Sequence, residues 1–372
     1  MIISIPRERR PQETRVAATP ETVRGYVSRG FTVRVEQNAG QLSGFIDEAY
    51  RQAGAEIISN QAALWNGADL ILKIWAPLPE EDLYLAPGQT IIANFQALDN
   101  RERAAVFANR QTTCFALELI PRLSRAQSMD ILTSQSNLAG YKAVLTGVNM
   151  LDKALPMMIT SAGTIQPARV LILGVGVAGL QAIATAKRLG AQVYAADVRP
   201  AVKEQVESLG GRFIDVENNE NFEDSRGYAE ETSQDYQTRQ QKAIAEQLAK
   251  TDLVITTALI PGKPAPRLIN AAMLRSMPNG SVVVDMAAAA GGNVEGSQDN
   301  QTVRVNGVTI IGNSNLAADL PASASTLFAQ NVFNFLNAMY DPQNQTLTFN
   351  FADELIDKTC ICKDGQLTGA LK

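Results

Sequence analysis

The feature that most constrains the fold of this chain is a short apolar run that ends in glycines, at residues 168–180. Its first half is β-branched residues and leucine, which suits a strand buried on both faces. Gly174, Gly176 and Gly179 follow with the spacing G-x-G-x-x-G, and the next ten residues have the apolar spacing of a helix. A second apolar strand then ends in Asp197. Strand, glycine turn, helix, strand and acid together form the pattern of a dinucleotide-binding Rossmann unit.

Each residue of this pattern has a separate physical task. Gly174 permits a tight turn, Gly176 lets the backbone approach a pyrophosphate, and Gly179 lets the helix pack closely on the sheet. Free N–H groups at the helix N-terminus attract the phosphates. Asp197 is placed to bind the adenosine ribose and to repel a 2′-phosphate, which favours NAD(H) over NADP(H). Arg199 argues the other way, because an arginine there can accommodate that phosphate.

Length and composition describe an ordinary α/β protein. A chain of 372 residues predicts two or three domains, and a net charge of -5 spread along it argues against nucleic acid as the main partner. It has neither an apolar run long enough to span a bilayer nor the pattern of a signal peptide. Cys114, Cys360 and Cys362 make no disulfide framework, so we expect a cytoplasmic protein. Cys360 and Cys362 could bind a metal, but two thiols without a partner cluster are more often incidental.

Histidine is absent from the chain. The usual general base, proton shuttle and transition-metal ligand are therefore missing. Any chemistry must use carboxylate, lysine, tyrosine or cysteine, or must need no proton transfer.

The chain as a whole predicts an α/β fold with two doubly wound Rossmann-like domains joined by long crossover helices, with a nucleotide in the cleft between them. Residues 1–135 and 320–372 would form a discontinuous first domain without a glycine fingerprint, and residues 136–319 the NAD(H)-binding domain. One crossover helix is expected at residues 136–155, ending before Pro156, and another is expected to begin at Pro321.

Three polar or irregular segments could carry function. Residues 121–130 are crowded with side chains that form hydrogen bonds, and they make either a solvated loop or a polar cluster aimed across a cleft. Residues 215–235 are acidic and nearly devoid of apolar side chains, so they form either a disordered insert or a lid that lays Tyr228 over a nucleotide. Residues 258–266 follow a buried strand, at the end of an open sheet where ligands bind.

Residues 6–20, 122–130, 136–142 and 255–266 resemble the alanine dehydrogenase and nicotinamide nucleotide transhydrogenase family, and the match covers essentially the whole chain. The alanine dehydrogenase branch has a histidine after the strand predicted at residues 90–93 and an aspartate after the one at residues 281–285. This chain has Gln96 and Ala97 in the first region and only alanines in the second, although Lys73 and Arg15 resemble that branch's substrate-binding residues. An amine oxidation without groups that handle protons would lose much of its rate, which disfavours this branch.

The transhydrogenase branch fits the missing histidines, because direct hydride transfer from NADH to NADP⁺ needs orientation and no substrate proton. The resemblance implies that Gln127 positions the nicotinamide and that Arg122 and Asp130 arrange its loop. The cofactor-binding residues that the pattern and the resemblance predict are Arg125, Ser128, Thr133, Gly174, Gly176, Val177, Gly179, Asp197, Val198, Arg199, Gly227, Tyr228, Ala258 and Leu259.

The resemblance also implies partners. The chain would be an NAD(H)-binding subunit, peripheral on the cytoplasmic face of a proton-translocating membrane complex. A beta subunit would hold NADP(H), a further subunit would span the membrane, and two copies of the chain would form a homodimer. Two alternatives remain open at this point: an amino-acid dehydrogenase similar to alanine dehydrogenase, and an NAD(H)-binding module without activity.

Overall fold

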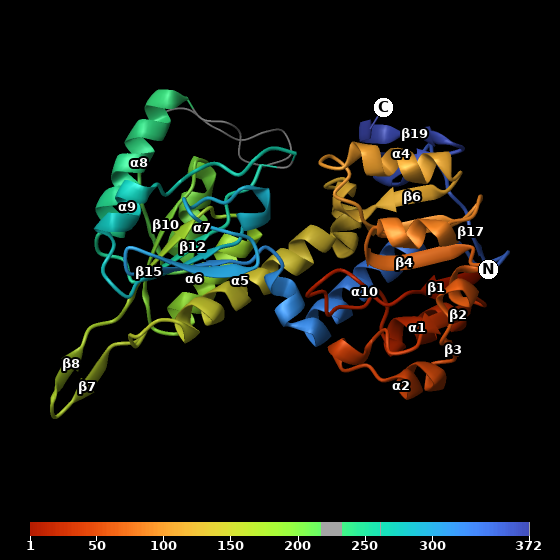
Figure 1. Cartoon of the computed structure of the whole chain (residues 1–372), viewed down its shortest axis with the longest axis horizontal. Helices are drawn as coiled ribbons and strands as arrows, with labels where there is room; N and C mark the ends of the chain where they lie inside the picture. Colours follow the sequence, from red (N-terminus) through yellow and green to blue (C-terminus); the bar gives the residue numbers. More distant parts are fainter. Residues whose placement is uncertain (217–232, 261, 372) are drawn as a thin grey trace. The chain divides into compact units, whose positions relative to one another are not determined.

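The computed structural model describes residues 1–216, 233–260 and 262–371, and the chain divides into two compact units. Unit 1 comprises Met1–Gln135 and Ala318–Lys372, and unit 2 comprises Ser136–Ala317 (Figure 1). Each unit is built on one large sheet with apolar cores on both of its faces. The predicted α/β fold with two Rossmann-like domains is confirmed.

The sheet of unit 1 contains six parallel strands in the order β3-β2-β1-β4-β5-β6. This is the doubly wound order, in which the chain starts in the middle of the sheet and builds outward in both directions. Two strands from the end of the chain, β18 and β19, continue the sheet antiparallel beyond β6. The strands of this sheet are β1 Ile2–Ile5, β2 Thr32–Glu36, β3 Glu56–Ile58, β4 Leu70–Trp75, β5 Thr90–Asn94, β6 Thr113–Ala116, β18 Cys360–Lys363 and β19 Gln366–Leu367.

Helices cover both faces of this sheet (Figure 1). The first of them begins as the sequence predicts: Thr19 and Thr22 form a capping box, and Pro20 occupies the first turn. The helices of unit 1 are α1 Pro20–Val27, α2 Asp47–Gln52, α3 Gln61–Trp65, α4 Arg101–Asn109, α10 Pro321–Asn337 and α11 Glu354–Thr359. Its shorter elements are η1 Gln41–Ser43, η2 Pro79–Tyr84, η3 Leu117–Leu119, η4 Ser124–Met129, η8 Gly369–Leu371, β16 Tyr340–Asp341 and β17 Thr346–Leu347.

Unit 2 repeats the same topology with the order β11-β10-β9-β12-β13-β15, followed by the antiparallel β14. Along β9 the apolar side chains alternate between two cores, so this strand is buried on both faces as its composition predicts. The elements are β9 Arg169–Leu173, β10 Gln192–Ala196, β11 Arg212–Phe213, β12 Leu253–Thr256, β13 Val282–Asp285, β14 Gln301–Val305, β15 Val308–Gly312, α6 Val177–Arg188, η5 Pro200–Val202, α7 Lys203–Ser208, α8 Gln234–Leu248, α9 Ala271–Ser276 and η6 Ala288–Ala290.

The first crossover helix differs from its prediction at both ends. Helix α5 spans Ile131–Asn149, not residues 136–155, and it carries the chain from unit 1 into unit 2. It begins early because the Asp130 carboxylate accepts hydrogen bonds from the Thr133 backbone N–H, at 2.9 Å, and from the Thr133 hydroxyl, at 2.6 Å. It ends early after Gly147 and Asn149, two poor helix formers. The chain returns to unit 1 through η7, Leu316–Asp319. The prediction that the helix beginning at Pro321 crosses between the domains is therefore wrong, because α10 lies entirely within unit 1.

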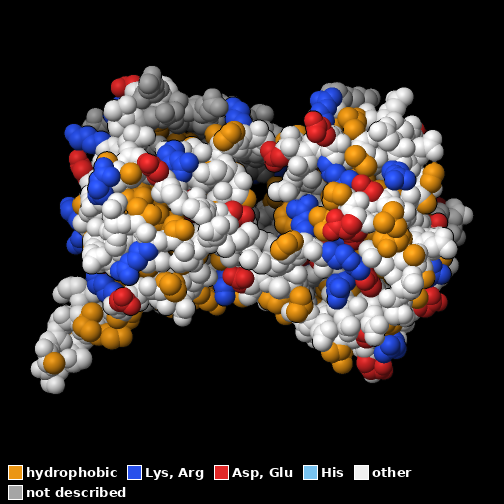
Figure 2. Space-filling view, viewed as in Figure 1, with side chains coloured by type: hydrophobic (Ala, Val, Ile, Leu, Met, Phe, Trp, Pro, Cys, Tyr) orange, Lys and Arg blue, Asp and Glu red, His pale blue; other side chains and the backbone are white. Residues whose placement is uncertain are grey.

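A two-stranded hairpin that the sequence analysis missed projects from unit 2. It pairs β7, Met158–Thr160, with β8, Gly163–Ile165, and extends away from the body of its unit (Figure 1). Its apolar side chains face solvent: Ile159 is 75% exposed and Met157 57% exposed. These side chains form an apolar patch at lower left in Figure 2.

The described part of the chain has no helix with the length and apolar character needed to cross a bilayer. The predicted lid with Gly227 and Tyr228 lies outside the described residues.

Candidate nucleotide site

The glycine turn joins β9 to α6, and its three glycines differ in what surrounds them. Gly174 has φ +94°, and a Cβ there would lie 2.7 Å from Thr257 Oγ1. A Cβ on Gly179 would lie 2.0 Å from the Gly174 carbonyl oxygen. By contrast, a Cβ on Gly176 would meet no described heavy atom within 4 Å. Packing therefore requires glycine at the first and third positions, whereas the second faces open space.

Helix α6 starts at this open space. Gly176 is its N-cap residue, and no side chain of the described residues caps it. Because the first N–H groups of a helix lack partners within it, the start of α6 offers donors and the positive end of the helix dipole. An anion such as a pyrophosphate is stabilised by such a helix start.

The carboxylate of Asp197, which follows β10, contacts the glycine turn. It accepts hydrogen bonds from the Val175 backbone N–H at 2.7 Å and from Arg199 Nε and Nη2, both at 2.9 Å. The side chains of Asp197 and Arg199 are 5% and 14% exposed, respectively. Arg199 therefore offsets part of the negative charge that would repel a 2′-phosphate, which weakens the expected preference for NAD(H).

The segment that follows β12 lies against the same turn. The Thr257 hydroxyl donates to the Gly174 carbonyl oxygen at 2.9 Å, and the Thr257 backbone N–H donates to Leu173 O at 2.8 Å. Leu259 is 46% exposed and Val177, in the first turn of α6, is 37% exposed. Two apolar side chains in the segments that meet at the glycine turn are thus partly exposed to solvent.

The structure brings together the predicted residues of unit 2, because they follow three neighbouring parallel strands at the edge where the strand order reverses. These residues are Gly174, Gly176, Val177, Gly179, Asp197, Val198, Arg199, Ala258 and Leu259.

Sequence reasoning missed two residues here, Thr257 and the fully buried Asn293, whose side chain binds Ala258. The local sequence signal for Asn293 is the glycine pair Gly291–Gly292 that precedes it. Both glycines have positive φ, a backbone conformation that favours glycine.

The predicted residues of unit 1 lie just before η4, on η4 and at the start of α5. Arg125 forms an ion pair with Asp353, at the N-cap of α11. The Ser128 carbonyl oxygen accepts hydrogen bonds from the side-chain amides of two asparagines of α10, Asn331 at 2.8 Å and Asn334 at 3.1 Å. The polar segment is therefore a fixed turn anchored on two helices.

The three predicted catalytic residues differ in their surroundings. Gln127 and Arg122 are exposed. Asp130 instead caps α5 through its hydrogen bonds with Thr133. The exposed side-chain amide of Gln127 has both donor and acceptor groups. It is therefore able to bind a carboxamide, which has the same groups.

Lys73 and Arg15 lie elsewhere in unit 1, and each is paired with one or more internal carboxylates. Lys73 Nζ is 3.4 Å from Glu8 Oε2 and 3.3 Å from Glu81 Oε1, and its side chain is only 1% exposed. Arg15 binds Glu13 through two nitrogens, at 2.8 and 2.7 Å. Burial raises the pKa of the Glu8 carboxyl. Burial also acts to raise that of Glu13, but hydrogen bonds and charge from Arg15 outweigh it and lower the Glu13 pKa to about 2.

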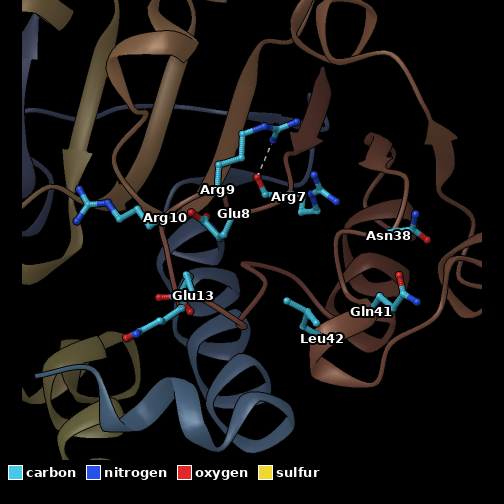
Figure 3. Close-up of a pocket in the computed structure, with 9 residues that line it drawn as sticks. Arg7, Glu8, Arg9, Arg10, Glu13, Asn38, Gln41 and Leu42 are labelled. Carbon is cyan, nitrogen blue, oxygen red and sulfur yellow. Dashed lines mark hydrogen bonds between the residues drawn. The ribbon is translucent and has the colours of Figure 1, made fainter. Parts of the chain in front are cut away.

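A hollow of about 440 Å³ opens beside this cluster. Its arginines do not converge on one point: Arg9 binds Glu36, Arg10 points away from Arg7, and the Arg10 guanidinium lies 4.7 Å from the ring centre of Trp75 (Figure 3). This arrangement does not form a converged anion site. The hollow is lined by Arg7, Glu8, Arg9, Arg10, Gln12, Glu13, Asn38, Gln41 and Leu42.

Comparisons with known proteins agree on one family. Residues 4–139 match the family model "Alanine dehydrogenase/PNT, N-terminal domain" and residues 143–370 match "Alanine dehydrogenase/PNT, C-terminal domain". A subunit alpha polypeptide of NAD(P) transhydrogenase from Rhodospirillum rubrum is 48% identical over 374 residues, which cover 99% of this chain and 97% of that protein. Alanine dehydrogenase of Bacillus subtilis is 32% identical, covering 89% of this chain and 83% of that protein.

A solved structure gives the same result. The crystal structure of transhydrogenase from Sinorhizobium meliloti superposes with a TM-score of 0.90 at 46% identity, covering 99% of this chain and all of that one. The family models and the relatives together span nearly the whole sequence. The chain therefore belongs to the alanine dehydrogenase/PNT family.

Proposed function

We propose that this chain is the NAD(H)-binding subunit of a proton-translocating NAD(P) transhydrogenase, which transfers hydride directly between NADH and NADP⁺ held on a partner chain. The observation that carries the proposal is the open space at Gly176, at the start of α6 and next to Asp197. The likeness of the whole chain to transhydrogenase subunits supports it.

In this proposal unit 2 is the NAD(H)-binding domain and unit 1 is the domain that orients the nicotinamide. The N–H groups at the start of α6 bind the pyrophosphate, and Asp197 accepts hydrogen bonds from the adenosine ribose. Val198 and Arg199, with Val177, Ala258 and Leu259, complete the contacts in unit 2. In unit 1, Gln127 binds the nicotinamide carboxamide, on a loop that Arg122 and Asp130 arrange and to which Arg125, Ser128 and Thr133 belong.

The reaction needs little from the protein besides orientation. Bound NADH supplies a hydride that moves with its electron pair to a second nicotinamide, and no substrate proton is removed. A chain without histidine is suited to this chemistry and poorly suited to oxidative deamination. In addition, internal carboxylates hold both cations that would bind an amino-acid carboxylate, Lys73 and Arg15.

The proposal includes partners. A beta subunit holds NADP(H), a membrane subunit carries the proton path, and this chain docks on them at the cytoplasmic face. Two copies of the chain form a homodimer, and the exposed apolar hairpin of unit 2 supports that state because monomeric proteins seldom expose such patches.

The test mixes the purified chain with the NADP(H)-binding domain of a transhydrogenase and follows hydride transfer from NADH to an NADP⁺ analogue. We expect NADH binding by the chain alone and transfer only in the mixture. Gln127→Asn, whose amide is one methylene shorter, should slow transfer more than it weakens NADH binding. Turnover of alanine, or of pyruvate with ammonium, by the chain alone would identify a dehydrogenase. NADH binding without transfer to any partner would identify a binding module.

A further inference from the structure

One buried side chain, Asn293, holds both ends of the loop at residues 258–266. Its Oδ1 accepts a hydrogen bond from the Ala258 backbone N–H at 3.1 Å. Its Nδ2 donates to the carbonyl oxygens of Ala258, at 2.9 Å, and Pro266, at 2.8 Å. Both side-chain atoms that can form hydrogen bonds are therefore used on this loop, and the side chain is fully buried.

Asn293 is itself held firmly by the segment after β13. The Asp285 carboxylate, also fully buried, accepts hydrogen bonds from the backbone N–H groups of Ala287, at 3.0 Å, and Val294, at 3.3 Å. Gly292 has φ +78°, and a Cβ on it would lie 2.8 Å from Asp285 Oδ2. The Asn293 carbonyl oxygen accepts from the backbone N–H groups of Leu268 and Ile269. These contacts fix the position of the Asn293 side-chain amide relative to the loop.

The loop at residues 258–266 lies on one side of the point where the strand order of the unit 2 sheet reverses. In a doubly wound dinucleotide-binding sheet, each half binds one mononucleotide, and the boundary lies where the strand order reverses. Asp197 follows β10, on one side of that boundary, whereas the loop follows β12, on the other side. The Thr257 hydroxyl bridges the boundary through its hydrogen bond to Gly174 O. If Asp197 serves the adenosine half, the loop faces the nicotinamide half.

We propose that Asn293 is a positioning residue that shapes residues 258 and 259 to bind the nicotinamide half of the dinucleotide. The inference rests on the proposed function, and it adds that the two halves of the nucleotide depend on different side chains. Asn293 does not need to touch the nucleotide, because it acts through the loop that it holds.

The decisive variant is Asn293→Asp, which keeps the size of the side chain but replaces two N–H donors by an oxygen that faces the carbonyl groups of Ala258 and Pro266. Loss of two buried hydrogen bonds predicts a Kd for NADH that rises about tenfold or more. The Kd for ADP, which carries only the adenosine half, should stay within about twofold. A purely structural role would not separate these two constants.

The matched control is Asn270→Asp, because Asn270 caps the neighbouring helix α9 through its side-chain oxygen and aspartate caps equally well. It should leave both constants unchanged. If Asn293→Asp does not fold, Asn293→Ala removes these two hydrogen bonds, and also the one that Asn293 Oδ1 accepts from the Ala258 backbone N–H, without adding charge. Equal weakening of NADH and ADP, or no weakening of either, in a folded Asn293 variant would overturn the inference. Absence of NADH binding by the unmodified chain would instead overturn the proposed function.

Discussion

At the scale of single residues, the strongest constraint on chemistry in unit 1 is that its buried cations Lys73 and Arg15 are paired with carboxylates. Glu8 and Glu81 flank Lys73, and Glu13 binds Arg15. Breaking such a buried pair by removing one partner is costly, because the remaining charge is left without compensation. The free energy of unfolding of unit 1 therefore depends on these buried charge pairs.

Glu13→Gln should make the stability of unit 1 less dependent on pH. The folded pKa of Glu13, about 2, lies below the ordinary value of 4.5, so its ionisation stabilises the fold above pH 4.5 and this contribution is lost as the pH falls toward 2. The shift corresponds to about 3 kcal/mol at neutral pH. The free energy of unfolding can be measured by denaturant titration at several pH values, with tryptophan fluorescence as the signal, since Trp65 and Trp75 both belong to unit 1.

The control for this experiment is Glu80→Gln, because Glu80 is exposed. It should keep the unfolding free energy and the pH slope of the unmodified chain. An equally steep slope in Glu13→Gln would show that other groups cause the acid sensitivity.

How far single residues could be predicted depends on whether they belong to a motif. The residues around the glycine turn could be predicted to lie together, because parallel strands that are neighbours place their carboxyl ends at one edge. Asn293 could not, since one buried asparagine carries no periodic signal and its partners are backbone atoms of a distant loop. The capping role of Asp130 was missed for a similar reason: the same side chain suits a catalytic loop and a helix start.

At the scale of secondary structure, the glycine turn separates what folding needs from what ligand binding needs. Gly174 and Gly179 are required by neighbouring atoms of the protein, whereas Gly176 is not. The conformation of Gly176, with φ -78° and ψ -165°, is one that alanine also adopts. A substitution there should therefore report on the ligand alone.

Gly176→Ala should leave the melting temperature of the nucleotide-free chain nearly unchanged and raise the Kd for NADH about tenfold or more, because the added methyl group occupies the space expected for the pyrophosphate. Gly179→Ala should instead destabilise the fold by about 1–3 kcal/mol, since its methyl group would overlap the Gly174 carbonyl. Thermal unfolding without nucleotide and NADH fluorescence titration separate the two effects. Unchanged NADH affinity in Gly176→Ala would contradict the proposed pyrophosphate position.

Apart from β18 and β19, the strands of both sheets could be predicted from the sequence to within one or two residues, because buried strands are short continuous apolar runs. No strand was expected at β18 and β19, in the last part of the chain. The ends of α5 could not be predicted, since a side-chain cap decides the first end and weak helix propensity the second. The β7–β8 hairpin was missed because its apolar residues face solvent and build no core that would give them a recognisable pattern.

At the scale of the whole molecule, both units share one doubly wound topology but differ at the strand ends that could bind a nucleotide. Unit 2 has the glycine turn, and unit 1 has the buried charge cluster and the anchored polar turn. The discontinuous first domain follows from the topology, because strands from the end of the chain extend the sheet that its beginning started. In the proposed function, the glycine turn of unit 2 would bind the pyrophosphate and Gln127 of unit 1 would orient the nicotinamide.

The hairpin of unit 2 should be the main contact of a homodimer. Replacing Ile159 and Ile165, which are 75% and 45% exposed, by serine should therefore convert a dimer into a monomer by removing apolar area from the interface. Light scattering coupled to size exclusion measures this directly, with a mass near twice 40.1 kDa for the unmodified chain and near 40.1 kDa for the variant. Leu42 and Ile46 of unit 1 are 65% and 61% exposed, so their replacement by serine is the matched control and should leave the dimer intact. If the unmodified chain is monomeric, or if the hairpin variant stays dimeric at all concentrations, the hairpin is not the contact of a homodimer. The apolar patch would then bind a different partner.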